Sequence, residues 1–307
     1  ASGGSLTVNR TTHDSKTSRD FQQSEYNWTV TADRLSWRPS RALGTDTANG
    51  GFMSTNTTSC VEPLTSPIRL TESRIYTGAA HGYGALIGAQ NGTNGQSITD
   101  FQAEHCEFIA VGTSWSGARL IALGNGANTD PEHTKNHRWK WCRFVKPETT
   151  GIIAGNEAIE YWRSSDITVE CCWIDSCGED GYEFVQPYRN NIVRYSGGGD
   201  VSGSTVGGNL VDFYGGGAAW ASSTGCQAHH LWGACGGDAV IVDACKNVTV
   251  NNCDITNVAG DFVQNPPAAN VRLHSRSAGS LDGVVVSTPL TAVGDSFNGF
   301  PCKLTYE

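Results

Sequence analysis

The feature that most constrains the fold is a short pattern that recurs along the chain and carries a cysteine at one fixed position. Residues 167–174 (ITVECCWI) and 248–255 (VTVNNCDI) both read apolar-x-apolar-x-x-Cys-x-apolar. Residues 101–108 (FQAEHCEF) fit the same frame, and residues 139–144 (WKWCRF) enter it two positions later. Chains that repeat at intervals of about 20 to 50 residues build arrays in which each unit stacks on its neighbours. The pattern therefore predicts a stacked architecture.

The spacing within each copy predicts β-strands and places the cysteine inside. Side chains alternate between the two faces of a strand, so Val248 and Val250 point to one side and Thr249 to the other. After a bend, the cysteine and the last apolar residue return to the interior. A buried cysteine behaves as a small hydrophobic residue, so we expect an interior ladder made of Cys106, Cys142, Cys172 and Cys253. The cysteines off this frame, which are the better disulfide candidates, are Cys60, Cys226 and Cys302.

A glycine-bearing turn and a second apolar strand follow, and no helical period of 3.6 residues accompanies them. The copies of this second strand fall near residues 84–88, 118–123, 151–154, 181–185, 210–213, 238–242, 260–263 and 283–286. The sequence therefore predicts an all-β chain, a right-handed parallel β-helix of about eight coils over residues 66–287. Because the ends of such a stack must be covered, we expect residues 1–65 to be an N-terminal cap and flanking segment and residues 288–307 a C-terminal cap.

Composition narrows the classes of partner. The chain has 37 glycines, 17% charged residues and a net charge of −9, and nucleic-acid binding needs a positive face. We therefore expect no nucleic-acid partner. Nor do we expect membrane insertion, because no apolar run approaches the roughly 18 residues of a spanning helix.

The alternating strands, the inward cysteine and the asparagine at the bend in residues 166–174 and 247–255 resemble coils of the pectate-lyase-like β-helix superfamily. The resemblance covers roughly residues 66–287 and reaches no single family, since polygalacturonase Asp-Asp with Gly-His-Gly and a pectate-lyase calcium cluster are both missing. It implies a secreted or extracellular protein, and a polysaccharide as partner. The fold alone does not fix an activity.

One column of outward carboxylates is the leading catalytic candidate. Residues at equal offsets in successive coils stack about 4.8 Å apart, and the alignment gives one outward offset to Glu183, Asp212 and Asp261, with Arg119 in an earlier coil. Adjacent carboxylates raise one pKa and can supply a protonated acid beside an ionised partner. One coil matches the separation of about 5 Å in retaining glycosidases, and two coils approach the wider inverting geometry. The alternative interpretation is a polar, solvent-facing position.

Two other outward columns mix acids and bases. The first contains Glu104, Lys140, Glu170 and Asn251, and the second contains Glu107, Arg143, Trp173 and Asp254. A polysaccharide lyase needs a cation and a base, for which Lys140, Arg143 and the neighbouring His137 are suitable. Ion pairs between neighbouring strands explain the same charges, and we favour that interpretation.

Aromatic residues in turns or at outward positions suit sugar stacking or the anchoring of loops; they are Trp115, Tyr161, Trp162, Trp173, Tyr188 and Trp220. The predicted substrate-binding set is Arg119, Lys140, Arg143, Trp173, Tyr188 and Trp220. His133 and His137 have the spacing of a helical zinc site, but Pro131 favours a loop. We expect neither a metal nor another cofactor.

The resulting hypothesis is an extracellular polysaccharide-binding protein that degrades its ligand on the lateral face of the β-helix, as a glycoside hydrolase or a polysaccharide lyase. The alternative is a non-catalytic structural β-helix, such as a virion appendage, adhesin or filament subunit. Sheet ends and lateral apolar faces would then be assembly surfaces of a homo-oligomer.

Overall fold

A computed structural model gives the arrangement of the chain. It describes residues 29–39, 68–78, 99–111, 134–145, 157–199, 206–214 and 224–251 (without 238–239, 244 and 246), and further strands at 5–9, 12–15, 19–22, 51–54, 87–88, 121–123, 254–257, 271–274, 285–287 and 296–297. These residues form strands, bends and turns and contain no helix. None of the described segments is a helix long and apolar enough to cross a membrane.

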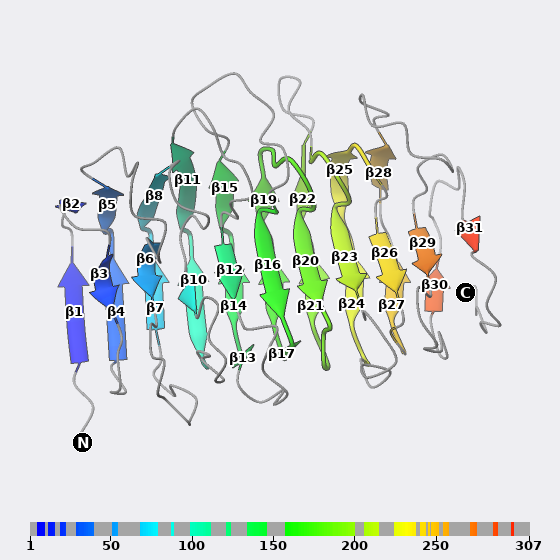
Figure 1. Cartoon of the computed structure of the whole chain (residues 1–307), viewed down its shortest axis with the longest axis horizontal. Helices are drawn as coiled ribbons and strands as arrows, with labels where there is room; N and C mark the ends of the chain where they lie inside the picture. The colour runs from blue at the N-terminus through cyan, green and yellow to red at the C-terminus, as the bar shows by residue number, and fades with distance from the viewer. Residues whose placement is uncertain are drawn as a thin grey trace.

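Three long sheets of ten, nine and seven strands run side by side along the longest axis of the molecule (Figure 1). The ten-stranded sheet contains β1 (Ser5–Asn9), β4 (Thr29–Asp33), β7 (Ile68–Thr71), β10 (Phe101–Glu104), β14 (Arg138–Lys140), β18 (Thr168–Glu170), β21 (Ile192–Arg194), β24 (Gln227–His229), β27 (Thr249–Asn251) and β30 (Val285–Ser287). The nine-stranded sheet contains β2 (Thr12–Ser15), β5 (Ser36–Pro39), β8 (Arg74–Gly78), β11 (Glu107–Val111), β15 (Arg143–Val145), β19 (Trp173–Ile174), β22 (Gly197–Gly198), β25 (Trp232–Cys235) and β28 (Asp254–Asn257).

The seven-stranded sheet contains β12 (Ile121–Leu123), β16 (Ile159–Trp162), β20 (Tyr182–Val185), β23 (Val211–Tyr214), β26 (Val240–Asp243), β29 (Val271–His274) and β31 (Ser296–Phe297). Two small sheets complete the described strands: β3 (Arg19–Gln22), β6 (Gly51–Ser54) and β9 (Ile87–Gly88) in one, β13 (Thr134–Lys135) and β17 (Ser164–Ser165) in the other.

Every pairing between these strands is parallel, as Gln227 with Thr249 and Val30 with Ile68 illustrate. The prediction of an all-β chain built from parallel strands is confirmed. The sheets also extend into the segment expected to be an N-terminal cap, because β1 pairs with β4 and β4 with β7. The alignment had missed β21 and β24, where Ser196 and Leu231 replace the cysteine of the pattern.

The interior is a continuous core of stacked side chains. Cys106, Cys142 and Cys172 are all buried, as the ladder predicts, and Cys253 lies outside the described residues. Cys226 is a free, buried thiol, so its prediction as a disulfide candidate is wrong, while Cys60 and Cys302 are not among the described residues.

Large aromatic residues fill much of this core. The rings of Tyr161 and Phe184 stack 5.6 Å apart, and Trp139 Nε1 donates a hydrogen bond of 2.7 Å to the Tyr161 hydroxyl. Tyr161 is fully buried, which corrects its prediction as an outward, sugar-stacking residue. Its interior position follows from the two-residue alternation, because Ile159 and Tyr161 share the inner face of β16.

At two corners of the backbone, equivalent residues have the left-handed conformation at successive levels of the stack. A level is one set of strands, one from each long sheet, that follow each other along the chain. The corner that leads into the ten-stranded sheet has positive φ at Asp100, Asn136, Asp166, Asn190 and Asn247. The corner between the ten- and nine-stranded sheets has positive φ at Arg34, Glu72, His105, Trp141, Cys171, Tyr195 and His230. We call the first the Asx corner. The second, together with Trp173 and Trp232 at the start of the strands that follow it, is called the aromatic corner.

Candidate functional site

Five carboxyl groups gather on the outer side of the seven-stranded sheet. Glu160 pairs in register with Glu183, and Glu183 with Asp212. Glu157 and Asp180 lie three positions before Glu160 and Glu183 and add a second, parallel row. Oxygen atoms of Glu157, Glu160 and Glu183 all lie within 4.8 Å of one another, and so do those of Asp180, Glu183 and Asp212. Glu183 belongs to both sets and is the centre of this carboxyl block.

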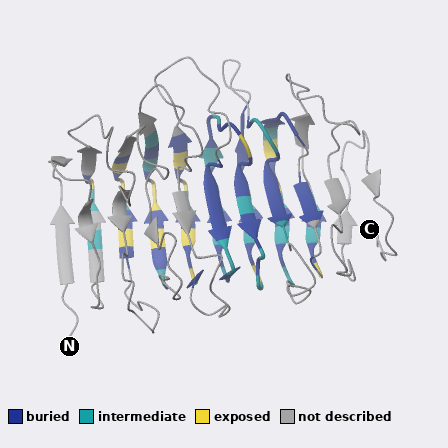
Figure 2. Ribbon diagram, viewed as in Figure 1, coloured by how far each residue is buried: buried dark blue, intermediate teal, exposed yellow. Residues whose placement is uncertain are grey.

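The carboxyl block is covered, although its position on the strands points away from the core. Glu160 is 2% exposed and Asp212 is 7% exposed. In β16 and β23 consecutive residues on both faces are buried, whereas β10 alternates between buried and exposed residues. Figure 2 shows the contrast as dark blue strands at β16, β20 and β23 beside the yellow bands of β10. Among the five carboxyl residues, Glu183 is the one that retains intermediate exposure.

Burial and mutual repulsion perturb the block strongly. Loss of hydration raises the pKa of Glu183 to about 11, and the charges of Glu160, Glu157, Asp180 and Asp212 add to this effect. Burial also raises the pKa of Asp180 to about 7, against a hydrogen bond of 2.6 Å that the Asn209 amide donates to Asp180 Oδ1. Glu183 Oε2 is buried without a hydrogen-bond partner. At neutral pH Glu183 is therefore a protonated acid.

The same oxygens are chemically suited to a hard divalent cation, which prefers carboxylate ligands. In each group of three residues, one oxygen atom per residue lies within 4.8 Å of the others. From the sequence we expected no metal at this place.

The structure brings two of the predicted catalytic residues together. Glu183 and Asp212 are direct register neighbours, as expected. In the next strands the equivalent position is held by Ile241 and then Arg272, so Asp261, which is outside the described residues, does not continue the column. Arg119 is also outside the described residues, and the register aligns Ala122 with Glu160 in its place.

Sequence reasoning missed Glu157, Glu160 and Asp180. It placed a strand at residues 151–154, whereas the strand that carries Glu160 is β16. A usable signal was present, because residues 157–161 (EAIEY), 180–184 (DGYEF) and 209–213 (NLVDF) share a polar residue, then an acid three positions later, then an aromatic ring.

The aromatic corner is the second place where candidate functional side chains gather. Each bend residue donates its backbone N–H to the next level: His105 to Lys140, Trp141 to Glu170, Cys171 to Arg194 and Tyr195 to His229, at 3.0 to 3.1 Å. The bend residues therefore form one column at the strand spacing. Of the large hydrophobic residues that the structure describes, the exposed ones are Trp141 (43%), Tyr195 (41%) and Trp232 (45%). All of them belong to this corner.

Rings at the corner contact one another along the column. His105 stacks on Trp141 at 4.6 Å between centroids, and Tyr195 lies 4.7 Å from His230. Lys140 Nζ lies 3.8 Å from the centroid of the Trp141 ring. The ring centroids of Trp173 and Trp232 are 6.3 Å apart although the two residues lie two levels apart. The residue at the level between them is Gly197, which has no side chain to keep the rings apart.

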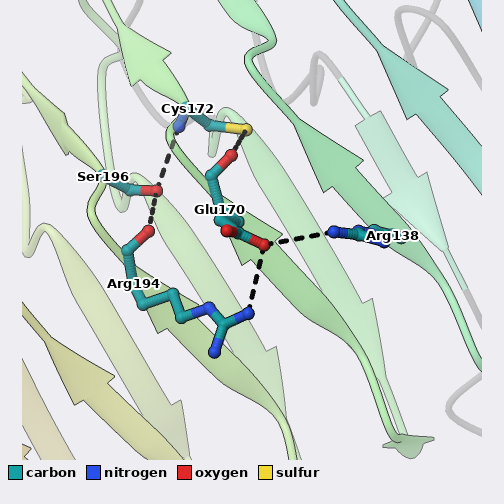
Figure 3. A network of polar contacts seen from close by, with 5 residues as sticks. All are labelled: Arg138, Glu170, Cys172, Arg194 and Ser196. Carbon is teal, nitrogen blue, oxygen red and sulfur yellow. Dashed lines mark hydrogen bonds and ion pairs between the residues drawn. The ribbon is translucent and has the colours of Figure 1, made fainter.

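The charged residues beside the corner are engaged with each other. Glu170 accepts hydrogen bonds from Arg138 at 3.4 Å and from Arg194 at 3.1 Å (Figure 3). Arg143 makes two hydrogen bonds to Asp175, at 2.9 and 3.0 Å. The favoured interpretation of these columns as cross-strand ion pairs is confirmed for Glu170, whose partners belong to the neighbouring strands β14 and β21.

The predicted binding residues separate into three groups. Lys140, Arg143 and Trp173 lie at or beside the aromatic corner. Tyr188 is half-buried and follows β20 toward the Asx corner, and Trp220 lies outside the described residues.

His137 was suggested as a lyase base, but it is buried, with its Nδ1 3.0 Å from the Tyr161 hydroxyl. An interior imidazole cannot reach a substrate at the surface. His133, its suggested partner in a zinc site, lies outside the described residues. Trp141, Tyr195 and Trp232 were not singled out, because their exposure follows from the corner geometry.

Comparison of the chain with models of known protein families, with curated proteins and with solved structures finds no match.

Proposed function

We propose that the chain is a right-handed parallel β-helix of the pectate-lyase-like kind, secreted, that binds a polysaccharide and hydrolyses it. The strand order supports the fold, because successive strands join the ten-, nine- and seven-stranded sheets in turn through most of the chain. The observation that carries the activity is the juxtaposition of Glu183 and Asp212 at paired positions of adjacent strands, with carboxyl oxygens within 4.8 Å.

Glycoside hydrolysis uses two carboxyl groups in different protonation states. Burial and four neighbouring acids keep Glu183 protonated, with its pKa raised to about 11, so it is the proton donor to the leaving oxygen. Asp212 is the second carboxyl group. Retaining enzymes place the two groups about 5 to 5.5 Å apart and inverting ones about 6.5 to 9.5 Å apart, so the close spacing favours retention of anomeric configuration.

Hydrolysis is favoured over lyase chemistry. A lyase needs a cation to neutralise the sugar carboxylate and a base to remove a proton. Arg143 and Arg194 are already engaged by Asp175 and Glu170. His137 lies inside the core against the Tyr161 hydroxyl, whereas Glu183, on the outer side of its sheet, keeps intermediate exposure. By contrast, hydrolysis requires the carboxyl pair and water.

The test is cleavage of a panel of polysaccharides, followed by reducing-end detection and by NMR of the first-formed anomer. We expect Glu183→Gln and Asp212→Asn each to lower kcat by about 10²- to 10⁴-fold, while the control Glu179→Gln, at the exposed neighbour of Asp180, keeps wild-type activity. Unchanged activity of Glu183→Gln would refute the assignment. Failure of the wild-type protein to cleave any member of the panel would favour the non-catalytic structural β-helix.

A further inference from the structure

The aromatic corner places residues where the backbone does not favour them. Both corners require positive φ, which is uncommon for residues other than glycine and is least unfavourable for Asn and Asp. The Asx corner follows this preference, with Asn136, Asp166 and Asn190 at successive levels. The aromatic corner has Trp141 at φ 51° and Tyr195 at φ 49° instead. Holding such residues in this conformation costs about 1 kcal/mol or more each, and such strain clusters at functional sites.

These rings also do not contribute to the core. Trp141, Tyr195 and Trp232 keep more than two-fifths of their surface exposed, so burial of apolar area does not explain their presence. A contiguous set of exposed apolar side chains marks an interaction surface more often than isolated ones do. The three rings lie along one corner of the stack, each within a group of neighbouring aromatic rings: Trp141 with His105, Tyr195 with His230, and Trp232 with Trp173.

The backbone positions that carry the rings repeat along the stack, which suits a linear polymer that runs in the same direction. Trp141 and Tyr195 are separated by one level, held by the small Cys171, so their positions repeat at two strand steps, or about 9.6 Å. Trp173 and Trp232 follow the same two-step interval, with Gly197 between them. A Cβ at Gly197 would collide with the Trp232 carbonyl oxygen and with the Trp173 ring. Glycine therefore permits the close approach of these two indoles.

The charges at the corner indicate an uncharged ligand. Arg138 and Arg194 are paired with Glu170, and Arg143 with Asp175. Lys140 lies against the Trp141 ring. An anionic polymer would have to compete with these carboxylates for the same cations, and the net charge of −9 opposes it further. Aromatic faces flanked by balanced polar groups match the apolar faces and hydroxyls of sugar rings.

We propose that the aromatic corner is a binding track for an uncharged linear polysaccharide, with sugar rings stacked on Trp141, Tyr195 and Trp232. This deepens the proposed function and rests on it for the ligand class, while the track itself is separate from the carboxyl block.

The experiment measures binding of the full chain to galactomannan, mixed-linkage β-glucan and polygalacturonate by native affinity electrophoresis and by tryptophan fluorescence at low and high salt. Trp141→Asn and Tyr195→Asn remove the rings and supply a residue that favours positive φ, so neither variant should have a Tm below that of the wild-type protein. Each should weaken binding of an uncharged polymer by roughly three- to tenfold. The matched control is Glu72→Asn, which changes the same column outside the aromatic run.

We expect retardation by at least one uncharged polymer, little dependence on salt, and wild-type binding by Glu72→Asn. The proposal of a binding track would be refuted if both ring variants kept wild-type affinity, or if the chain bound polygalacturonate alone in a salt-sensitive way. Absence of binding to both uncharged polymers would overturn it as well. Glu183→Gln separates the two proposals, because it should lower kcat by about 10²- to 10⁴-fold and leave binding intact.

Discussion

The carboxyl block and the aromatic corner use the same device with opposite results. In both, equivalent residues of successive strands stack at the strand spacing. On the seven-stranded sheet the stacked residues are Glu160, Glu183 and Asp212, which are all carboxylic acids and are largely covered. Beside the corner, Glu170 stacks between Lys140 and Arg194 near the surface. Because the backbone repeats, side chains at equivalent positions lie next to one another, and the sequence decides whether these neighbours are groups of the same kind or of opposite charge.

The two regions are expected to respond to pH in opposite directions. The pKa of Glu183 is raised in the folded chain, so folding retains a proton that the unfolded chain releases above its pKa of about 4.3. The free energy of unfolding therefore falls as pH rises. Burial alone would raise the pKa of Glu170, but the hydrogen bond and charge of Arg194 outweigh it and lower the pKa. Its contribution is present above the unfolded pKa and is lost as pH falls.

The largest expected effect comes from the carboxyl block. Asp180→Asn and Glu183→Gln should raise the free energy of unfolding at pH 8, by several times the roughly 0.5 kcal/mol that bounds most surface changes, because they remove groups that must be protonated to stay buried. Asp180 titrates near its folded pKa of about 7 and Glu183 near about 11. The gain should disappear near pH 4, where the folded and unfolded chains both hold the proton. Urea unfolding across this pH range is the measurement, and a gain independent of pH would contradict the assignment.

A smaller effect of opposite sign is expected at Glu170. Glu170→Gln should lower the free energy of unfolding at pH 7 by about 1 kcal/mol or less, since it breaks the ion pairs with Arg138 and Arg194. Below the folded pKa of Glu170 the variant and the wild-type protein should have equal stability. Thermal unfolding at several pH values checks this, with Glu104→Gln, an exposed position of the same column, as the control. A loss that persists in acid would show that packing, and not charge, is responsible.

The smallest effect concerns the histidine pair at the end of the aromatic corner. His229 Nδ1 lies 2.9 Å from His230 Nδ1, and burial, with the charges of His230 and Arg194, lowers the pKa of His229. Stability from this group is therefore present above its unfolded pKa and lost as pH falls. In His230→Asn the pKa of His229 should move back toward its usual value. NMR titration of the ring protons measures it, and an unchanged pKa would leave burial and the charge of Arg194 as the causes.

Much of the strand pattern could be predicted from alternation and the cysteine frame. Cys106, Cys142 and Cys172 are interior as expected, and the columns that contain Lys140 and Arg143 have the expected register. The prediction failed at levels that lack the cysteine. The level of β21 escaped the alignment because Ser196 replaces the cysteine. Its hydroxyl donates a hydrogen bond of 2.8 Å to the Arg194 carbonyl, as Cys172 Sγ donates one of 3.3 Å to the Glu170 carbonyl. Sequence similarity does not reveal this equivalence between a hydroxyl and a thiol.

The candidate site was only half predictable for a different reason. Glu183 and Asp212 share an offset that short-range alternation determines. Whether an outward face is covered depends on contacts far along the chain, and strand periodicity says nothing about them. The exposure of Trp141 and Tyr195 is likewise a property of a bend at positive φ. The usual inference that large aromatic residues are buried therefore fails there.

The reactivity of the cysteines in the interior ladder reports local unfolding of the chain. The hydrogen bond with Cys142, together with burial, raises the pKa of the Cys106 thiol far above the usual range, and burial raises that of Cys142; alkylating reagents react with thiolates. A native fold therefore protects Cys106, Cys142 and Cys172 at three successive levels, while the half-exposed Cys171 stays within reach. Comparing their labelling rates by mass spectrometry would reveal whether neighbouring levels open together or one at a time, without any engineered probe.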